Sequence, residues 1–346
     1  MDQAWREGVV RTARHTSFYL DCGPAEGPLL VFLHGWPELS ISWRHQLPCF
    51  AAMGFRCIAP DMRGYGRSSV HPAPADYALE PIAADMLELL AALGRERAVW
   101  IGHDWGSPVV WSLAAHHPDR CLAVANLCVP YVPAGFALPN LVALVDRRTY
   151  PAAEYPAGQW DYQCFYEENP ARARAVFEAD VDATVRALFR RGNPAARGKP
   201  GRTATIRRDG GWFGGADRAP DVPLDEAVLT PVDHSRYVAA LSRTGFAGPD
   251  SWYLNHAANA AYAARAPDGG RLAVPVLFLH GAHDTTCETI DSDLARPMRE
   301  ACADLTEVVV QSGHWMAQEQ PAAVNAALAR WLAQRVPAAW LSVPAR

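Results

Sequence analysis

The sequence predicts an α/β protein built on a doubly wound, mostly parallel sheet. Its strand candidates are short runs in which nearly every residue is apolar, and such runs are typical of strands buried on both faces of a parallel sheet. Helical patterns separate the runs, and this alternation is the arrangement from which doubly wound sheets are built. A long central segment lacks strands of this type. We therefore expect a mainly helical insertion in the sheet domain.

The elements expected before the insertion alternate between strands and helices. In chain order they are a hairpin over 8–21, strands at 29–33, 55–60, 98–101 and 121–129, and helices at 43–53, 82–93 and 106–117. Gly94 follows the second helix, and glycine in this position commonly ends a helix. Pro108 fits the first turn of the third helix, where its missing N–H costs no helical hydrogen bond.

The character of the sequence changes at Pro130. From there the chain is rich in proline, glycine, arginine and aromatic residues. Later elements are helices at 171–191 and 231–241, a glycine-rich loop at 207–223, strands at 274–279 and 305–310, a helix at 322–335 and a peripheral tail from Val336. We expect a core domain from residues 1–130 and 267–346 and a helical cap from residues 131–266. Such an insertion commonly covers the carboxyl ends of the strands, where ligands bind.

Length and composition indicate an ordinary globular protein. The chain has 346 residues, half of them hydrophobic, and a net charge of -5. No basic stripe indicates nucleic-acid binding, no apolar run reaches the roughly 18 residues of a membrane helix, and the first residues lack a signal-peptide layout. The eight cysteines form no CxxC pair, which is typical of reduced thiols. We expect a cytoplasmic protein with no metal, nucleic-acid or membrane partner.

Residues 98–106 hold the motif on which the functional prediction depends. An apolar strand runs into a tight segment centred on Asp104 and passes directly into a helix. Glycines two residues before and two residues after Asp104 allow backbone to approach backbone in a sharp turn. This is the geometry of the nucleophile elbow, G-x-S-x-G, with aspartate in place of the usual serine. The segment by itself also fits a turn whose aspartate caps the helix.

Two later residues complete the order nucleophile, acid, histidine. Asp284 and His314 each follow one of the last two predicted strands. A carboxylate with a pKa of about 3.9 is ionised at neutral pH, so Asp104 can attack an sp³ carbon directly and form an ester. His314, supported by Asp284, then deprotonates the water that hydrolyses this ester. The three residues therefore predict a catalytic triad with a covalent ester intermediate.

Hydrolysis of such an ester builds an oxyanion that needs backbone N–H donors. Trp105 follows Asp104 directly and supplies one donor. Trp36, in the loop after the strand at 29–33, is placed to supply the other.

Short motifs carry a resemblance to a known family over nearly the whole chain. They are His34-Gly35-Trp36-Pro37-Glu38, Asp61-Met62-Arg63-Gly64-Tyr65-Gly66-Arg67-Ser68, Gly102-His103-Asp104-Trp105-Gly106 and Ser312-Gly313-His314-Trp315. With these motifs the sequence resembles the epoxide hydrolases of the α/β-hydrolase superfamily. The resemblance implies the α/β-hydrolase fold and a cofactor-independent ether-bond hydrolase that converts a small-molecule epoxide to a vicinal diol. It leaves the natural substrate and the oligomeric state open, and a homodimer is compatible with it.

The resemblance also implies two cap tyrosines that donate to the epoxide oxygen. This oxygen leaves as an alkoxide, and a tyrosine keeps its proton at neutral pH and can donate it to a strong base. The family's two tyrosine segments are similar to residues 160–166 and 245–255, so the role is carried over to Tyr162 and Tyr253. Tyr166 competes with Tyr162 for the first position.

Aromatic residues of the cap predict an apolar pocket for an aryl or alkyl epoxide. The residues expected to bind substrate are Trp160, Phe165, Trp212, Phe213 and Trp252. Asp250 departs from the family pattern, because a leucine-like residue is more usual before the second tyrosine. This departure removes no catalytic atom.

Two other functions compete with epoxide hydrolysis. A haloalkane dehalogenase shares the aspartate elbow, and the indole of Trp105 fits a halide donor. Many dehalogenases, however, have an asparagine where Trp36 stands, and Tyr162 and Tyr253 have no role in halide release. A non-catalytic small-molecule receptor on the same fold would not need a triad, two cap tyrosines and an oxyanion loop, and the sequence has all of these. We therefore predict an epoxide hydrolase.

Overall fold

A computed structural model describes residues 5–340 of the chain. Its strands are β1 (Arg6–Arg11), β2 (Thr16–Cys22), β3 (Leu29–Leu33), β4 (Arg56–Pro60), β5 (Ala98–His103), β6 (Cys121–Leu127), β7 (Val276–Gly281) and β8 (Leu305–Val310). They form one eight-stranded sheet in the order β1-β2-β4-β3-β5-β6-β7-β8. The pairs β1–β2 and β2–β4 are antiparallel, and all other neighbours are parallel. The doubly wound, mostly parallel sheet predicted from the sequence is confirmed.

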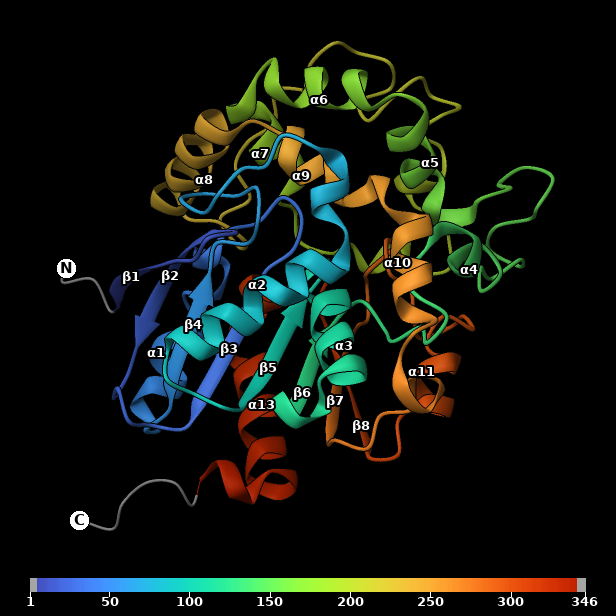
Figure 1. The fold of residues 1–346 in the computed structure, drawn as a ribbon. Coiled ribbons are helices and arrows are strands. Elements are labelled where there is room, and N and C mark those ends of the chain that lie inside the picture. Colours follow the sequence, from blue (N-terminus) through green and yellow to red (C-terminus); the bar gives the residue numbers. More distant parts are fainter. Residues whose placement is uncertain (1–4, 341–346) are drawn as a thin grey trace.

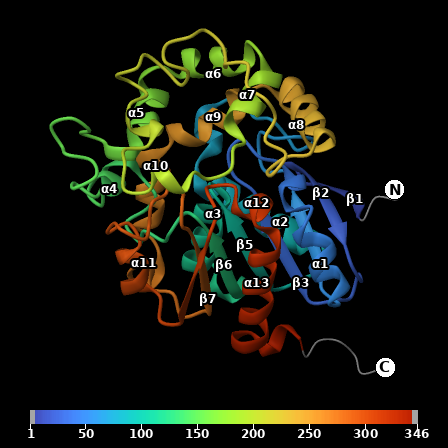
Figure 2. The same cartoon turned by 180° about the vertical axis from the view of Figure 1, so that it is seen from behind.

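Helices cover both faces of this sheet. In Figures 1 and 2, α2 (Leu79–Ala92) and α3 (Gly106–His116) lie on one face, and α1 (Gln46–Ala52) and α13 (Pro321–Arg335) lie on the other. Two short helices, α11 (Arg296–Ala301) and α12 (Met316–Glu319), follow β7 and β8 in the chain. Strands β3, β5 and β7 are buried along their whole length, because helices exclude water from both faces.

Residues 128–275 add no strand to the sheet and run above it as helices and loops. The helices are α4 (Leu138–Val142), α5 (Asp161–Glu168), α6 (Pro170–Glu178), α7 (Val181–Leu188), α8 (Pro231–Thr244), α9 (Ala247–Ser251) and α10 (His256–Ala263). Figure 1 shows them gathered over one end of the sheet, towards which the parallel strands point. Within residues 5–340, no helix combines the length and the apolar character needed to cross a bilayer.

The structure makes two sequence-based expectations more precise, one on a helical segment and one on the tail. The single helix expected over 171–191 is divided into α6 and α7, because Asp180 starts a new helix by accepting a hydrogen bond from the backbone N–H of Ala183. The tail from Val336 is packed up to residue 340, and the ring of Trp340 lies 4.8 Å from that of Phe55. Residues 341–346 lie outside the described part of the chain.

The motif at residues 61–68 follows β4, and its side chains form hydrogen bonds with a neighbouring loop and with helix α2. The carboxylate of Asp61 accepts hydrogen bonds from the backbone N–H groups of Ser40 and Arg67, at 3.0 and 2.9 Å. Arg63 binds Asp85 of α2 through two hydrogen bonds of 2.7 Å, and both side chains are buried. The motif therefore holds the end of β4 against its neighbours and is not part of the reacting centre.

Replacement of Asp85 should destabilise the whole domain. Asp85→Ala leaves the buried guanidinium of Arg63 without its carboxylate, so we expect the free energy of unfolding to fall by about 3 kcal/mol or more. Urea denaturation of both proteins measures this difference. Glu88→Ala is the control, because its partner Arg14 is partly exposed and such a pair contributes less than about 1 kcal/mol. Equal losses in the two variants would contradict a structural role for the buried pair.

Candidate active site

Asp104 occupies the sharp turn between β5 and α3. Its φ of 48° lies in the left-handed region, which residues other than glycine rarely adopt. A Cβ on Gly106 would lie 2.2 Å from the carbonyl oxygen of Leu33, and one on Gly102 would lie 2.6 Å from the carbonyl oxygen of Gly106. The turn is therefore possible only with glycine at both positions, and it raises the Asp104 side chain above the sheet.

The three acid and base residues come together from the ends of β5, β7 and β8. Nδ1 of His314 lies 2.9 Å from Oδ2 of Asp284, and Nε2 of His314 lies 3.4 Å from Oδ2 of Asp104. Backbone N–H groups of Thr286 and Cys287 donate to the other oxygen of Asp284, at 2.9 and 3.0 Å. Asp284 is thus fixed from both sides and in turn fixes the orientation of the His314 ring.

The charges of this group are strongly coupled. Burial by itself lowers the pKa of His314, but the charge of Asp284 and hydrogen bonds to Asp104 and Asp284 raise it well above its usual value. Burial raises the pKa of Asp284, but the charge and hydrogen bond of His314 outweigh this and lower the pKa to about 2. Both shifts favour the charged pair, with a proton on the His314 ring and none on Asp284.

The loop after β3 contacts the Asp104 carboxylate directly. The backbone N–H of Trp36 donates a hydrogen bond of 2.7 Å to Oδ1 of Asp104. A Cβ on Gly35 would lie 2.3 Å from this oxygen and 2.6 Å from the backbone nitrogen of Trp105. The backbone nitrogens of the two expected oxyanion donors, Trp36 and Trp105, therefore both lie close to Gly35 and next to Asp104.

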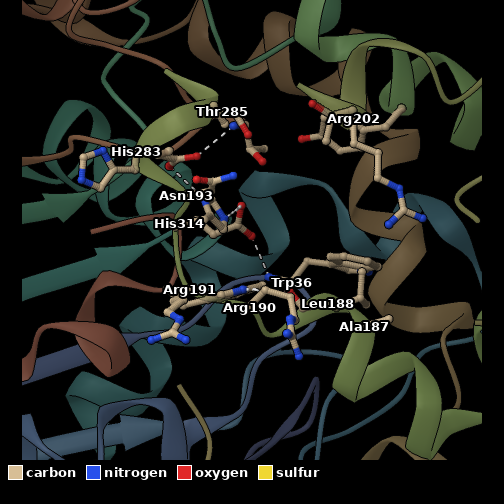
Figure 3. Close-up of a pocket in the computed structure, with 18 of the residues that line it drawn as sticks. Trp36, Ala187, Leu188, Arg190, Arg191, Asn193, Arg202, His283, Thr285 and His314 are labelled. Carbon is tan, nitrogen blue, oxygen red and sulfur yellow. Dashed lines mark hydrogen bonds and ion pairs between the residues drawn. The ribbon is translucent and has the colours of Figure 1, made fainter. Parts of the chain in front are cut away.

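A cavity of about 310 Å³ is lined by Asp104, and Figure 3 shows Trp36 and His314 among its other lining residues. Tyr162 and Tyr253 line it together with Asp104, Trp36 and His314. Burial raises the pKa of both tyrosine hydroxyls well above the usual value, so they remain protonated at neutral pH. The hydroxyl of Tyr162 accepts a hydrogen bond of 3.1 Å from its neighbour Gln163, and its own proton is available to another acceptor.

Tyr166 lies behind this wall and does not line the cavity. Its ring stacks on that of Tyr253 at 4.4 Å with an interplanar angle of 6°. Its hydroxyl is buried and has no hydrogen-bond partner among the described residues. The position of Tyr166 is that of a packing residue, whereas Tyr162 faces the same space as Asp104.

Most of the aromatic residues expected to bind substrate do not reach the cavity. Trp212 lines it and stacks on Trp36 at 5.7 Å. The other four are buried in the surrounding layers: Trp160 packs against Phe136, Phe213 against Phe177, Trp252 against Tyr65, and Phe165 lies within α5. The expectation is therefore not supported for Trp160, Phe165, Phe213 and Trp252. Their sequence positions do not reveal which face of a short helix or loop points inward.

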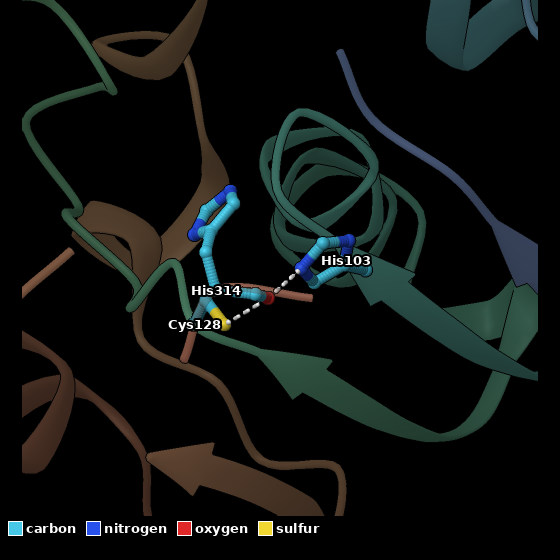
Figure 4. Close-up of side chains that lie close together, drawn as sticks. All are labelled: His103, Cys128 and His314. Carbon is cyan, nitrogen blue, oxygen red and sulfur yellow. Dashed lines mark hydrogen bonds between the residues drawn. The ribbon is translucent and has the colours of Figure 1, made fainter. Parts of the chain in front are cut away.

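Sequence reasoning missed a buried ion pair below the triad. Nε2 of His103 and Sγ of Cys128 lie 2.7 and 3.3 Å from the backbone carbonyl oxygen of His314 (Figure 4). Nδ1 of His103 lies 2.6 Å from the carboxylate of Glu38. Both ring nitrogens of His103 face acceptors, so both carry protons. The sequence did contain a signal for this pair, because Glu38 and His103 both belong to the short motifs singled out in the sequence analysis, at residues 34–38 and 102–106.

The pKa values of this pair agree with its geometry. Burial by itself lowers the pKa of His103, but the charge of Glu38 raises it well above the usual value. Burial raises the pKa of Glu38, but the charge and hydrogen bond of His103 lower it to about 2. The charged pair therefore holds the backbone of His314 at a fixed place.

Asp250, the departure noted in the sequence, contacts the same loop. Its Oδ1 accepts a hydrogen bond of 3.0 Å from the indole N–H of Trp36, and its Oδ2 is buried with no hydrogen-bond partner among residues 5–340. Burial raises the pKa of Asp250 well above its usual value, which favours the protonated form of this side chain. It connects α9, close to Tyr253, with the oxyanion loop.

Two groups of side chains have the spacing of metal ligands. They are His103, Cys128 and His314, and Asp284, Cys287 and His314, with ligand-type atoms within 4.8 Å of one another in each group. His103 and Cys128, however, both bond to the His314 carbonyl, and Asp284 and His314 bond to each other. We therefore interpret both groups as parts of the hydrogen-bond network.

Comparison with known proteins gives the family. Residues 28–202 match the family model described as alpha/beta hydrolase fold. Epoxide hydrolase A from Mycobacterium tuberculosis is 34% identical over 90% of this chain and 92% of its own length. Bifunctional epoxide hydrolase 2 from Sus scrofa is 33% identical over 88% of this chain, which spans about half (51%) of that protein.

Solved structures agree with these relatives. Epoxide hydrolase A from Mycobacterium thermoresistibile superimposes with a TM-score of 0.79 at 33% identity, over 95% of this chain and 98% of that one. An epoxide hydrolase from an endophytic Streptomyces has a TM-score of 0.79 at 30% identity, over 96% of both chains. The chain therefore belongs to the α/β-hydrolase fold family, in the group whose named members are epoxide hydrolases.

Proposed function

We propose that this protein hydrolyses epoxides to vicinal diols through a covalent ester on Asp104, below a cap formed by residues 131–266. One observation carries the proposal: Asp104, His314, Tyr162 and Tyr253 line a single cavity. This cavity combines a carboxylate nucleophile, a base and two protonated phenols. A nucleophile of this type suits attack on an sp³ carbon, and the phenols suit an oxygen that leaves as an alkoxide.

In the first step, Asp104 attacks a ring carbon of the epoxide. The hydrogen bond from Trp36 holds Oδ1 of Asp104, and Oδ2 is left to form the new C–O bond. The carbon–oxygen bond of the epoxide breaks at the same time, and its oxygen takes a proton or a strong hydrogen bond from Tyr162 and Tyr253. The product of this step is a hydroxyalkyl ester of Asp104.

In the second step, His314 activates water. Once Asp104 is an ester it carries no negative charge, so one of the groups that raise the pKa of His314 is lost. His314 loses a proton, which replaces the proton that a tyrosine gave to the epoxide oxygen. The neutral imidazole then takes a proton from water, and Asp284 stabilises the imidazolium that forms. Water adds to the ester carbonyl, and the N–H groups of Trp36 and Trp105 stabilise the oxyanion. The bond between the carbonyl carbon and the alkyl oxygen then breaks, this oxygen takes the remaining proton of the added water, and release of the diol restores the Asp104 carboxylate.

A single turnover in ¹⁸O-water tests the covalent step. Excess enzyme is mixed with an aryl epoxide, and the diol and the peptide that contains Asp104 are analysed by mass spectrometry. The oxygen added to the diol comes from the Asp104 carboxylate, so we expect unlabelled diol and ¹⁸O on Asp104. Labelled diol in the first turnover would mean direct attack by water. Halide release from a haloalkane, without any diol from an epoxide, would favour a dehalogenase.

Removal of the cavity-lining hydroxyls should slow ester formation. We expect Tyr162→Phe and Tyr253→Phe each to lower the rate of this step by about 10²-fold, because each removes a proton donor to the leaving oxygen. Tyr166→Phe is the matched control, because its hydroxyl lies outside the cavity, and its rate should stay close to that of the parent protein. Stopped-flow tryptophan fluorescence measures the step. A loss for Tyr166→Phe equal to that for Tyr162→Phe would transfer the first donor role to Tyr166.

The pH profile of turnover should depend on Asp284. His314 acts as a base only when neutral, so the rate rises with pH through its pKa. Asp284→Asn removes a negative charge that raises this pKa, so the rise should move to lower pH while kcat at neutral pH falls. Asp291→Asn, at an exposed carboxylate paired with Arg197, should leave the profile unchanged. A shift to higher pH in Asp284→Asn would contradict the assignment.

A further inference from the structure

One directed hydrogen bond joins the indole of Trp36 to the helices above the sheet. Its N–H donates to Oδ1 of Asp250 in α9, at 3.0 Å. Both residues are buried, with 5% of Trp36 and 3% of Asp250 exposed. The other neighbours of the indole are aromatic rings that pack against it, among them Phe177 and Tyr253, with ring centroids at 5.4 and 5.9 Å. Among residues 5–340, Asp250 therefore supplies the acceptor on which this N–H depends.

The backbone of Trp36 contacts the nucleophile. Its N–H donates a hydrogen bond of 2.7 Å to Oδ1 of Asp104, the oxygen that becomes the ester carbonyl oxygen in the proposed reaction. The preceding N–H, that of Gly35, donates to the carboxylate of Glu38 at 3.0 Å. Glu38 thus holds the loop from its backbone, and Asp250 holds it from the Trp36 side chain. Asp250 does not line the cavity, so it can act on Asp104 only through Trp36.

A buried carboxyl group at position 250 is costly unless it has a role. Burying a polar group without full hydrogen bonding costs free energy, and Oδ2 of Asp250 has no hydrogen-bond partner among residues 5–340. A leucine-like residue, which is more usual at this position, would avoid that cost. It would, however, leave the indole N–H of Trp36 without an acceptor. The contact with Trp36 therefore accounts for an acid at this position.

We propose that Asp250 is a positioning residue that keeps the backbone N–H of Trp36 aimed at Oδ1 of Asp104 while this oxygen becomes the oxyanion. The inference rests on the proposed function and assigns Asp250 to its second step, the hydrolysis of the ester. In the first step Oδ1 loses negative charge, so a poorly placed donor costs little. In the second step negative charge develops on Oδ1, so the placement of the donor affects the rate most strongly.

Variants at positions 250, 251 and 36 test the proposal. Asp250→Leu removes the acceptor, Asp250→Asn keeps an acceptor oxygen at nearly the same size, and Trp36→Phe removes the indole N–H. Ser251→Ala is the matched control, because its hydroxyl donates to the carbonyl oxygen of Ala247 within α9 and not to the Trp36 loop. Excess enzyme is mixed with an aryl epoxide, and the reaction is quenched at successive times. Mass spectrometry of the intact protein then gives the rates at which the ester forms and is hydrolysed.

We expect Asp250→Leu to slow hydrolysis of the ester by about tenfold and to change the rate of its formation by less than about twofold. The ester should therefore accumulate in this variant. Asp250→Asn should hydrolyse the ester at close to the parental rate, and Ser251→Ala should match the parent protein in both steps. In a Trp36→Phe background, Asp250→Leu should have little further effect on hydrolysis, because both changes remove the same hydrogen bond.

Three outcomes would overturn the proposal. No loss in Asp250→Leu, or an equal loss in both steps, would mean that Asp250 has no role specific to hydrolysis. A loss in Asp250→Asn as large as that in Asp250→Leu would mean that the acceptor oxygen is not responsible. Independent effects of Asp250→Leu and Trp36→Phe would mean that the bond between them does not carry the effect.

In each of these cases the parent protein still converts the epoxide, so the proposed function stands without this inference. If the parent protein forms neither an ester nor a diol from any epoxide, the proposed function fails and the inference fails with it.

Discussion

The site depends on the close contact between the ends of β3 and β5. These strands are neighbours in the sheet, with Leu33 opposite Gly102, although the two segments lie far apart in the chain. The loop after β3 therefore falls against the turn that carries Asp104, and the N–H of Trp36 reaches its carboxylate. Glycine at positions 35, 102 and 106 allows this approach, because a Cβ at any of them would meet backbone or the Asp104 side chain.

Two buried ion pairs act on His314 in different ways. Asp284 contacts the ring, so it fixes the orientation of the ring and raises its pKa. Glu38 and His103 contact the backbone carbonyl through His103, so they set the place from which the ring extends. Because the desolvation of buried ion pairs offsets much of their attraction, we attribute positioning to these pairs and not a large contribution to stability.

The helices above the sheet complete the site mainly through aromatic packing. The indole of Trp36 lies among rings from several of these elements, including Trp212 at 5.7 Å and Tyr253 at 5.9 Å. Asp250 adds one directed hydrogen bond to this otherwise apolar contact. The segment that carries Tyr253 is thereby held against the loop that carries Trp36.

The sequence by itself determined the sheet, the elbow and the order of the triad. Each depends on a local pattern: apolar runs for the strands, glycines around Asp104 for the turn, and Asp284 and His314 after strand ends that meet at one edge of a parallel sheet. The resemblance to epoxide hydrolases added the positions of the tyrosines.

Only the tertiary structure decided what faces the cavity. It placed Tyr162 at the wall and Tyr166 behind it, and it left Trp212 as the one lining residue among the five expected aromatics. Short helices and loops above the sheet carry too few turns for a periodic pattern to define an inward face. The direction of each side chain there follows from packing against segments distant in sequence, which no local pattern records.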